Sequence, residues 1–141
     1  MNLINIYKEN VRYLIKNPQK IKKIIKRIIN DYEYSLVYLN MIITQDENVR
    51  VINNLYLGKD NYTDIISFDY SETKRNIEGE LYISFDRIKE NAQKYKISID
   101  NELVRIIIHG VLHLVGENDD SASNKLKMRQ KEDMYLNLCF T

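Results

Sequence analysis

The chain has 141 residues, of which 44% are hydrophobic and 29% charged, with only four glycines and one proline and a formal net charge of +1. This length and composition predict one globular domain over residues 1–141 and exclude collagen-like and disordered classes. The apolar runs are too short for a membrane span and the N-terminus lacks the layout of a signal peptide, so we expect a cytoplasmic protein without a membrane partner.

The N-terminal quarter predicts a strand followed by a basic helix. Residues 2–8 alternate apolar and polar side chains, and Asn17 and Pro18 are typical of a capped helix start before isoleucines at helical spacing. The basic side chains of this segment, with no acid among them, are Lys16, Lys20, Lys22, Lys23, Lys26 and Arg27. Because the whole chain is rich in Lys, Ile, Asn and Tyr, a mixture typical of AT-rich coding, this basic stripe indicates nucleic-acid binding only weakly.

The middle of the chain predicts three strands and one helix. Residues 35–44 are predicted to form a strand, and a helix should begin at a capping Asp46 and run through about Leu57, where Gly58 ends it. Residues 63–69 and 79–84 are typical of buried strands joined by a polar connection over 71–78. Gly79 is expected at a turn or a close backbone approach, and Glu80 is expected to be exposed or to face a cleft.

The C-terminal half predicts three helices. Ser84 should cap a helix to about Tyr95, a second helix should run from Asp100 to Gly116, and a third from about Ser121 to Leu138. Cys139, the single cysteine, cannot form an internal disulfide and is expected to be a small apolar filler. The order of elements, with one hairpin-like strand pair, predicts an α+β domain: a small mixed sheet of about four strands flanked by about five helices.

The segment HGVLHLVGENDD, residues 109–120, holds both histidines of the chain. On a helix, His109 and His113 share one face about 5 to 6 Å apart at Cβ, so both imidazoles can reach one metal ion at the end of a central helix. Gly116 allows the chain to turn back and bring a following carboxylate as a third ligand. Three ligands and an open position describe a catalytic zinc site, which acidifies bound water to a pKa of about 7.

Two other interpretations of the segment stay open. The histidines can be ordinary helix residues while Asp119 or Asp120 caps the last helix, although Asp120 or Ser121 can also cap while Asp119 binds a metal. A zinc peptidase of the HExxH type places its general base directly after the first histidine, where this chain has Gly110. That glycine disfavours a peptidase.

The motifs resemble those of one family. HGVLHLVG (109–116) resembles the HGxLHLxG signature of the YbeY family, bacterial zinc-dependent endoribonucleases implicated in ribosomal RNA maturation and ribosome quality control. TDIISF (63–68) resembles the TDVLSF strand of that family, GELYIS (79–84) resembles its GDIxIS strand, and Met128, Glu132 and Leu136 fit its closing helix. The resemblance runs from about Leu36 to Leu138 and implies an α+β domain with helices around a small mixed sheet.

The resemblance also implies a ligand set. The HxxxHxxxxxH pattern of the family falls on His109, His113 and Asp119, so an aspartate stands at the third position, with Asp120 as the alternative if the register differs by one residue. Aspartate oxygen is a common zinc ligand, so we expect one Zn²⁺ per chain, with other divalent metals also compatible.

A second departure lies before the GKD turn, where many members carry an arginine and this chain has Leu57. An arginine there would clamp a phosphate or stabilise its developing charge. Lys59 is our candidate for this catalytic work, with Arg50 and Arg105 as alternatives, although each residue taken alone is more typical of a solvated surface charge.

Thr63, Asp64 and Ser67 lie in the motif that resembles the TDVLSF strand. The resemblance implies that they lie near the metal cleft, whereas polar residues at a strand entrance also commonly satisfy local backbone groups. Asp64 is our candidate for orienting a ligand histidine.

The favoured function is metal-assisted cleavage of single-stranded ribosomal RNA, with the basic helix around Lys20 to Arg27 tracking the RNA backbone. The resemblance implies contacts with the small ribosomal subunit and with an assembly GTPase, and DNA is not expected as a partner. One alternative is a non-catalytic ribosome-assembly factor with a structural metal, which Leu57 favours. Another is a metal-dependent hydrolase of a different substrate.

Overall fold

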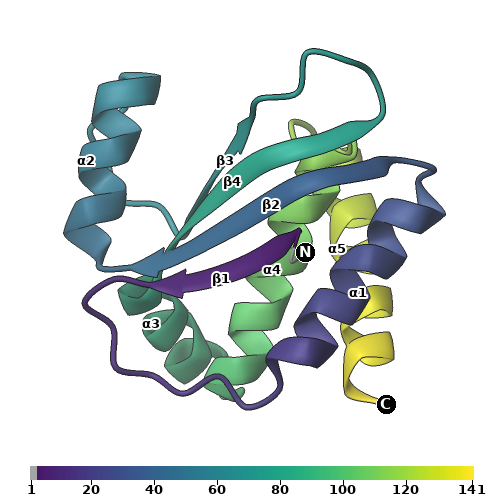
Figure 1. The fold of residues 1–141 in the computed structure, drawn as a ribbon. Coiled ribbons are helices and arrows are strands. Elements are labelled where there is room, and N and C mark those ends of the chain that lie inside the picture. Colours follow the sequence, from purple (N-terminus) through teal and green to yellow (C-terminus); the bar gives the residue numbers. More distant parts are fainter. Residues whose placement is uncertain (1–2) are drawn as a thin grey trace.

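The computed structural model describes residues 3–141, which form a sheet and a layer of helices packed against it (Figure 1). Residue 2 of the predicted first strand (2–8) lies outside the described residues. The elements in chain order are β1 (Ile4–Lys8), α1 (Pro18–Asp31), β2 (Ser35–Thr44), α2 (Asp46–Leu57), β3 (Ile65–Asp69), β4 (Asn76–Ser84), α3 (Phe85–Tyr95), α4 (Ile99–Leu114) and α5 (Ala122–Phe140).

The sheet is mixed, as the sequence predicts. Its strands lie in the order β1-β2-β4-β3; β1 and β2 are parallel, β2 and β4 are parallel, and β3 runs antiparallel to β4. Alternate residues of β4, among them Ile77, Leu81 and Ile83, are buried in the core. The α+β class and the four-stranded sheet with five helices are therefore confirmed for the described residues.

Helix α4 is the central helix, and it packs on α1, α3, α5, β3 and β4. Ten of its 16 residues are buried, so apolar side chains surround most of its circumference. Gly110 lies where α4 meets the sheet, and a Cβ there would lie 2.7 Å from Cδ1 of Ile65 and 3.1 Å from Cδ2 of Leu81. The glycine lets β3 and β4 lie close to the helix on the turn that carries the histidines.

Several boundaries differ from those predicted. β4 begins at Asn76, because its first residues pair with the start of β2, so the hairpin connection is shorter than 71–78. β3 begins at Ile65 rather than residue 63, and α4 begins at Ile99 because Ser98 Oγ accepts a hydrogen bond from Asn101 N at 3.0 Å. α4 ends at Leu114, two residues before Gly116, and α5 continues beyond Leu138 to Phe140.

One predicted cap is confirmed in position and one is wrong. Asn17 occupies the N-cap position of α1, directly before Pro18, although its side chain makes no capping hydrogen bond and its backbone carbonyl accepts from Lys20 N at 3.1 Å. Gln45 occupies the N-cap position of α2, and Asp46 is the first helical residue. The Asp46 carboxylate lies 3.2 Å from Arg87 Nε and forms an ion pair between α2 and α3. The side chain predicted to cap α2 therefore joins two helices instead.

The remaining turn and packing predictions are confirmed. Ser84 Oγ accepts a hydrogen bond from Arg87 N at 3.3 Å and caps α3, and Gly58 ends α2 with φ 65°. Gly79 lies at a close backbone approach, because a Cβ there would collide with the backbone carbonyl of Phe68. Cys139 is buried. Over residues 3–141, no helix has the length and apolar character that a membrane span needs.

Candidate metal centre

Three potential metal ligands converge at the C-terminal end of α4. His109 Nε2 lies 3.0 Å from His113 Nε2 and 3.6 Å from Asp119 Oδ2, and His113 Nε2 lies 3.7 Å from Asp119 Oδ1. The helix spacing places the two histidines, and the turn after α4 places the aspartate. Gly116 adopts φ 99°, and Glu117 N then donates to Leu112 O at 2.9 Å, which turns the loop back over the helix end.

The second ring nitrogen of each histidine has its own acceptor. His109 Nδ1 lies 2.7 Å from Glu132 Oε2 on α5, and His113 Nδ1 lies 3.0 Å from the backbone carbonyl oxygen of Glu117. Because carboxylate and carbonyl oxygens accept hydrogen bonds, each Nδ1 carries the proton and donates. Each Nε2 then presents a lone pair toward the other and toward Asp119. Three acceptors that face one another require a cation or a shared proton between them.

The spacing fits a small divalent ion. Zinc bonds of about 2.0 to 2.1 Å in tetrahedral geometry separate the ligand atoms by about 3.3 Å. The three distances here, 3.0, 3.6 and 3.7 Å, lie around that value. Two imidazoles and a carboxylate form a zinc-type donor set, so His109, His113 and Asp119 are a group able to hold a metal ion.

Electrostatics at His109 reflect the same arrangement. Burial by itself lowers the pKa of His109, but the hydrogen bond from its ring to Glu132 and the charges of Glu132, Asp119 and Asp64 outweigh burial and leave that pKa raised. A carboxylate bonded to the outer nitrogen of a ligand histidine orients the ring and increases its basicity. The site is therefore built to attract positive charge.

Asp119 rather than Asp120 faces the histidines. Asp120 Oδ1 accepts a hydrogen bond from Asn124 Nδ2 at 2.8 Å, which directs it toward α5. Ser121 Oγ accepts from Asn124 N at 3.1 Å and caps α5. Capping and the metal site thus use different residues of one short loop.

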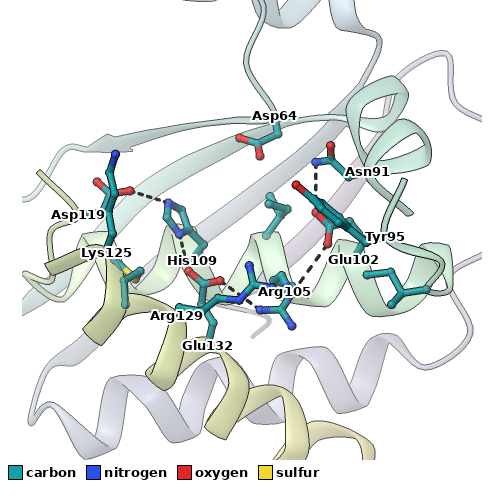
Figure 2. A pocket seen from close by; sticks show the side chains of 13 residues that line it. Asp64, Asn91, Tyr95, Glu102, Arg105, His109, Asp119, Lys125, Arg129 and Glu132 are labelled. Carbon is teal, nitrogen blue, oxygen red and sulfur yellow. Dashed lines mark hydrogen bonds and ion pairs between the residues drawn. The ribbon is translucent and has the colours of Figure 1, made fainter. Parts of the chain in front are cut away.

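Glu132 has a role that the sequence interpretation did not assign to it. Asp64 was the candidate for orienting a ligand histidine, but both Nδ1 atoms are taken by Glu132 and Glu117. Asp64 instead faces the cavity next to His109 (Figure 2), and burial is the main reason that its pKa is raised. The signal for Glu132 was an acid on the buried face of a helix, four residues from Met128 and four from Leu136.

Two cavities border the histidines. The first, of about 560 Å³, is lined by the Leu57–Ser67 region, including Leu57, Lys59, Thr63 and Ser67, and by His113. The second, of about 550 Å³, extends along α3, α4 and α5. Both cavities are lined by Asp64, His109 and Asp119, so the metal-ligand group lies where they meet. A polymer could occupy both cavities with one of its bonds at the histidines.

The three candidates for the work of the family arginine occupy different places. Lys59 lines the first cavity and, within residues 3–141, has no ion-pair partner within 4.0 Å. Arg105 lines the second cavity but is held by Asp133 at 3.0 Å and Glu132 at 3.4 Å. Arg50 is bound to Asp60 at 2.9 Å and lines neither cavity.

Comparisons with known proteins point to one family. The family model described as Endoribonuclease YbeY matches residues 5–139. A curated relative named Endoribonuclease YbeY from Cytophaga hutchinsonii is 41% identical over 135 residues, covering 96% of this chain and 94% of the relative. Another of that name, from Amoebophilus asiaticus, is 41% identical over 134 residues, covering 94% of this chain and 91% of the relative.

A solved structure gives the same result for the fold. The solution structure of a Thermotoga maritima protein superposes with a TM-score of 0.67 at 25% identity, covering 97% of this chain and 89% of that protein. The assignment to a family rests on more than the histidine motif, because the family model matches nearly every helix and strand of the chain. The chain belongs to the YbeY endoribonuclease family.

Proposed function

We propose that the chain is a metal-dependent endoribonuclease that cleaves single-stranded RNA during ribosomal RNA maturation. The observation that carries this proposal is the convergence of His109, His113 and Asp119 at the junction of two cavities. Membership in a family described as Endoribonuclease YbeY supports RNA as the substrate. An extended single strand fits such a site better than a duplex does, because its backbone can bend through adjoining cavities.

The proposed metal ligands are His109, His113 and Asp119, with one Zn²⁺ per chain. When bound, the ion supplies Lewis-acid charge for the phosphodiester and makes water more acidic. Glu132 holds the Nδ1 proton of His109 and thereby keeps Nε2 aimed at the ligand position. Asp64 faces the same space with a raised pKa, which suits a carboxyl group that exchanges a proton with the reacting groups.

Lys59 is proposed to bind the phosphate at the position where the family arginine would act. Leu57 and Lys59 line the same cavity, but only the lysine carries a charge. Lysine binds phosphate as a point charge and lacks the two-pronged geometry of arginine, so some loss of rate relative to arginine-containing members is expected. A charged group in this cavity weakens the case for a non-catalytic assembly factor, which rested on Leu57.

The basic face of α1 is proposed to bind RNA farther from the reaction. α1 packs on β2, α4 and α5, and none of its residues lines either cavity at the histidines. Contacts to the RNA backbone there would add affinity that falls with salt. The small ribosomal subunit and an assembly GTPase are the proposed cellular partners, and the cytoplasm is the proposed location.

A substrate comparison tests the proposal. Zinc-loaded protein should cut a single-stranded RNA, leave the same sequence largely intact in a duplex, and leave the corresponding DNA intact. Equal cleavage of duplex and single strand would contradict the proposed substrate class. Binding of ribosomal subunits without any cleavage would favour the assembly-factor alternative.

A further inference from the structure

Glu102 is a buried acid in the second cavity with one unsatisfied oxygen. The residue is 3% exposed, and its Oε2 accepts a hydrogen bond from Asn91 Nδ2 at 3.2 Å. Within residues 3–141, Glu102 Oε1 is buried and has no hydrogen-bond partner, and Arg105 Nε lies 3.9 Å away, which is too far for a hydrogen bond. A buried acceptor without a donor is unfavourable, so natural proteins seldom keep one without a use.

The rest of this cavity combines flat apolar surface with polar edges. Figure 2 shows Tyr95, from the last turn of α3, beside Glu102 and Asn91. The Tyr95 side chain is exposed, with Lys94 Nζ 5.4 Å from its ring centroid, and Ile97 and Met128 add apolar lining. Aromatic surface next to a few convergent polar groups is how proteins hold unpaired RNA bases. A volume of about 550 Å³ is ample for one base with part of its sugar.

The cavity is continuous with the metal-ligand group. It is lined by His109 and Asp119 as well as by Glu102, and Lys125 and Arg129 of α5 add positive charge along the same wall. A base held against Glu102 would therefore belong to a nucleotide next to the phosphodiester at the histidines. The positive side chains would face the phosphates of that strand.

We propose that the second cavity is a base-recognition subsite in which an unpaired RNA base stacks on Tyr95 and donates from its Watson–Crick edge to the Glu102 carboxylate. This inference rests on the proposed nuclease function and adds a specificity-determining residue to it. Asn91 positions the Glu102 carboxylate through the bond to Oε2. Arg105, which lies between Glu102 and Glu132, links the subsite to the group that orients His109.

Base chemistry makes the preference specific. Guanine presents N1–H and the N2 amino group side by side, so it offers two donors to a carboxylate, whereas adenine and cytosine each offer one amino group. Uracil offers N3–H between two carbonyl oxygens, which would face the Glu102 carboxylate unfavourably. The subsite should therefore prefer guanine and reject uracil.

Equilibrium binding separates this role from a purely structural one. The 5′-monophosphates of the four ribonucleosides are titrated by calorimetry into the zinc-loaded wild type and into Glu102→Gln, Tyr95→Ala and Glu72→Gln variants. Glu72 is an exposed acid of the hairpin connection, so Glu72→Gln is a matched control. Wild type and control should bind guanosine monophosphate about tenfold more tightly than uridine monophosphate, the loss expected for one hydrogen bond to a charged group.

The variants should change binding in different ways. Glu102→Gln presents an amide donor as well as an acceptor, so the preference for guanosine over uridine should disappear. Tyr95→Ala removes an exposed ring and should weaken all four nucleotides by a similar factor without disturbing the fold. If Glu102 serves only to tie α3 to α4 through Asn91, the wild type binds the four nucleotides alike, and that result overturns the proposal. Unchanged binding by Tyr95→Ala overturns it as well, even if Glu102→Gln fails to fold.

Cleavage mapping on a random-sequence single-stranded RNA distinguishes the subsite from the nuclease function. One position flanking the cut should be depleted of uracil in the wild type, and this depletion should vanish in Glu102→Gln. Base-selective binding without cleavage would retain the subsite and reject the nuclease. Cleavage without a preference at any flanking position would retain the nuclease and reject the subsite.

Discussion

Glu132 Oε2 lies 2.7 Å from Nδ1 of His109, so a carboxylate of the last helix holds a histidine of the central helix. This contact fixes the ring of His109 with its other nitrogen toward His113 and Asp119. It also makes the metal-ligand group depend on the packing of α5 against α4.

Replacement of Glu132 by Gln should weaken zinc binding about tenfold, because loss of the partner of a ligand histidine typically costs ten- to a hundredfold in metal affinity. Competition against a chromogenic chelator measures this directly. Asp133→Asn is the matched control, since Asp133 lies on the same helix and contacts Arg105 but not His109. Equal zinc affinity in wild type and Glu132→Gln would show that the contact does not tune the site.

Replacement of Asp119 by Ala should remove stoichiometric zinc, whereas Asp120→Ala should retain it. Asp119 faces both histidine Nε2 atoms, while Asp120 bonds to Asn124. Asp119→His, which introduces the residue usual in the family, should keep one zinc per chain. Metal analysis of the purified variants gives the stoichiometry, and zinc lost from Asp120→Ala but kept in Asp119→Ala would reverse the assignment.

Replacement of Lys59 by Ala should lower kcat/KM for RNA tenfold or more at unchanged zinc content, because the cavity then loses the cation proposed to bind the phosphate. Lys74→Ala, in the hairpin connection, is the control for a change in overall charge. Leu57→Arg should raise the rate above wild type. A Lys59→Ala variant with wild-type kinetics would assign the phosphate contact to another residue.

The basic face of α1 should affect binding more than turnover. Conversion of Lys22, Lys23 and Lys26 to Ala should weaken RNA binding. The slope of log affinity against log salt should also become less negative by about 2, since each phosphate contact to a single strand contributes roughly 0.7 to that slope. The rate at saturating RNA should stay within about twofold of wild type, because α1 lines neither cavity. An unchanged salt slope would remove α1 from the RNA path.

Glu102 should make stability depend on pH. Burial is the main cause that raises the pKa of this carboxyl above its ordinary value of 4.5. When the pKa of a carboxyl is higher in the folded than in the unfolded state, the folded state binds the proton more tightly. The free energy of unfolding therefore falls as pH rises from the unfolded-state pKa to the folded-state pKa. Urea unfolding of metal-free protein should therefore show Glu102→Gln gaining stability relative to wild type as pH rises above the ordinary carboxyl pKa of 4.5. A constant difference between the two proteins would contradict this origin.

Local sequence patterns predicted the metal-ligand residues but not the residues that orient them. The spacing of His109 and His113 follows from one helix, and Gly116 signals the turn that brings back Asp119. The choice between Asp119 and Asp120 depends on how the loop bonds to Leu112 and Asn124, which no local pattern fixes. Glu132 lies 23 residues from His109 on another helix, so periodicity identified its buried face and not its partner.

The same limit explains the errors in the fold. Asp46 has the side chain of a capping residue, but it is the first helical residue of α2 and pairs with Arg87, whereas Asn17 holds the predicted N-cap position without a side-chain bond. Gly110 was read only as a missing general base, whereas the structure gives it a packing reason at the contact with Ile65 and Leu81. At Asp46 and Gly110 the residue type indicated a special position, but the residue that it contacts in the fold lies far away in the sequence.

The most direct test of the metal-dependent nuclease is cleavage of a single-stranded ribosomal RNA fragment by the stoichiometrically zinc-loaded protein, run beside metal-free protein and a His113→Ala, Asp119→Ala double variant. The loaded wild type should cleave the RNA, the other two samples should leave it intact, and cleavage should recover when zinc is returned to the metal-free wild type. Equal cleavage by all three samples, or intact RNA in every one, would contradict that function.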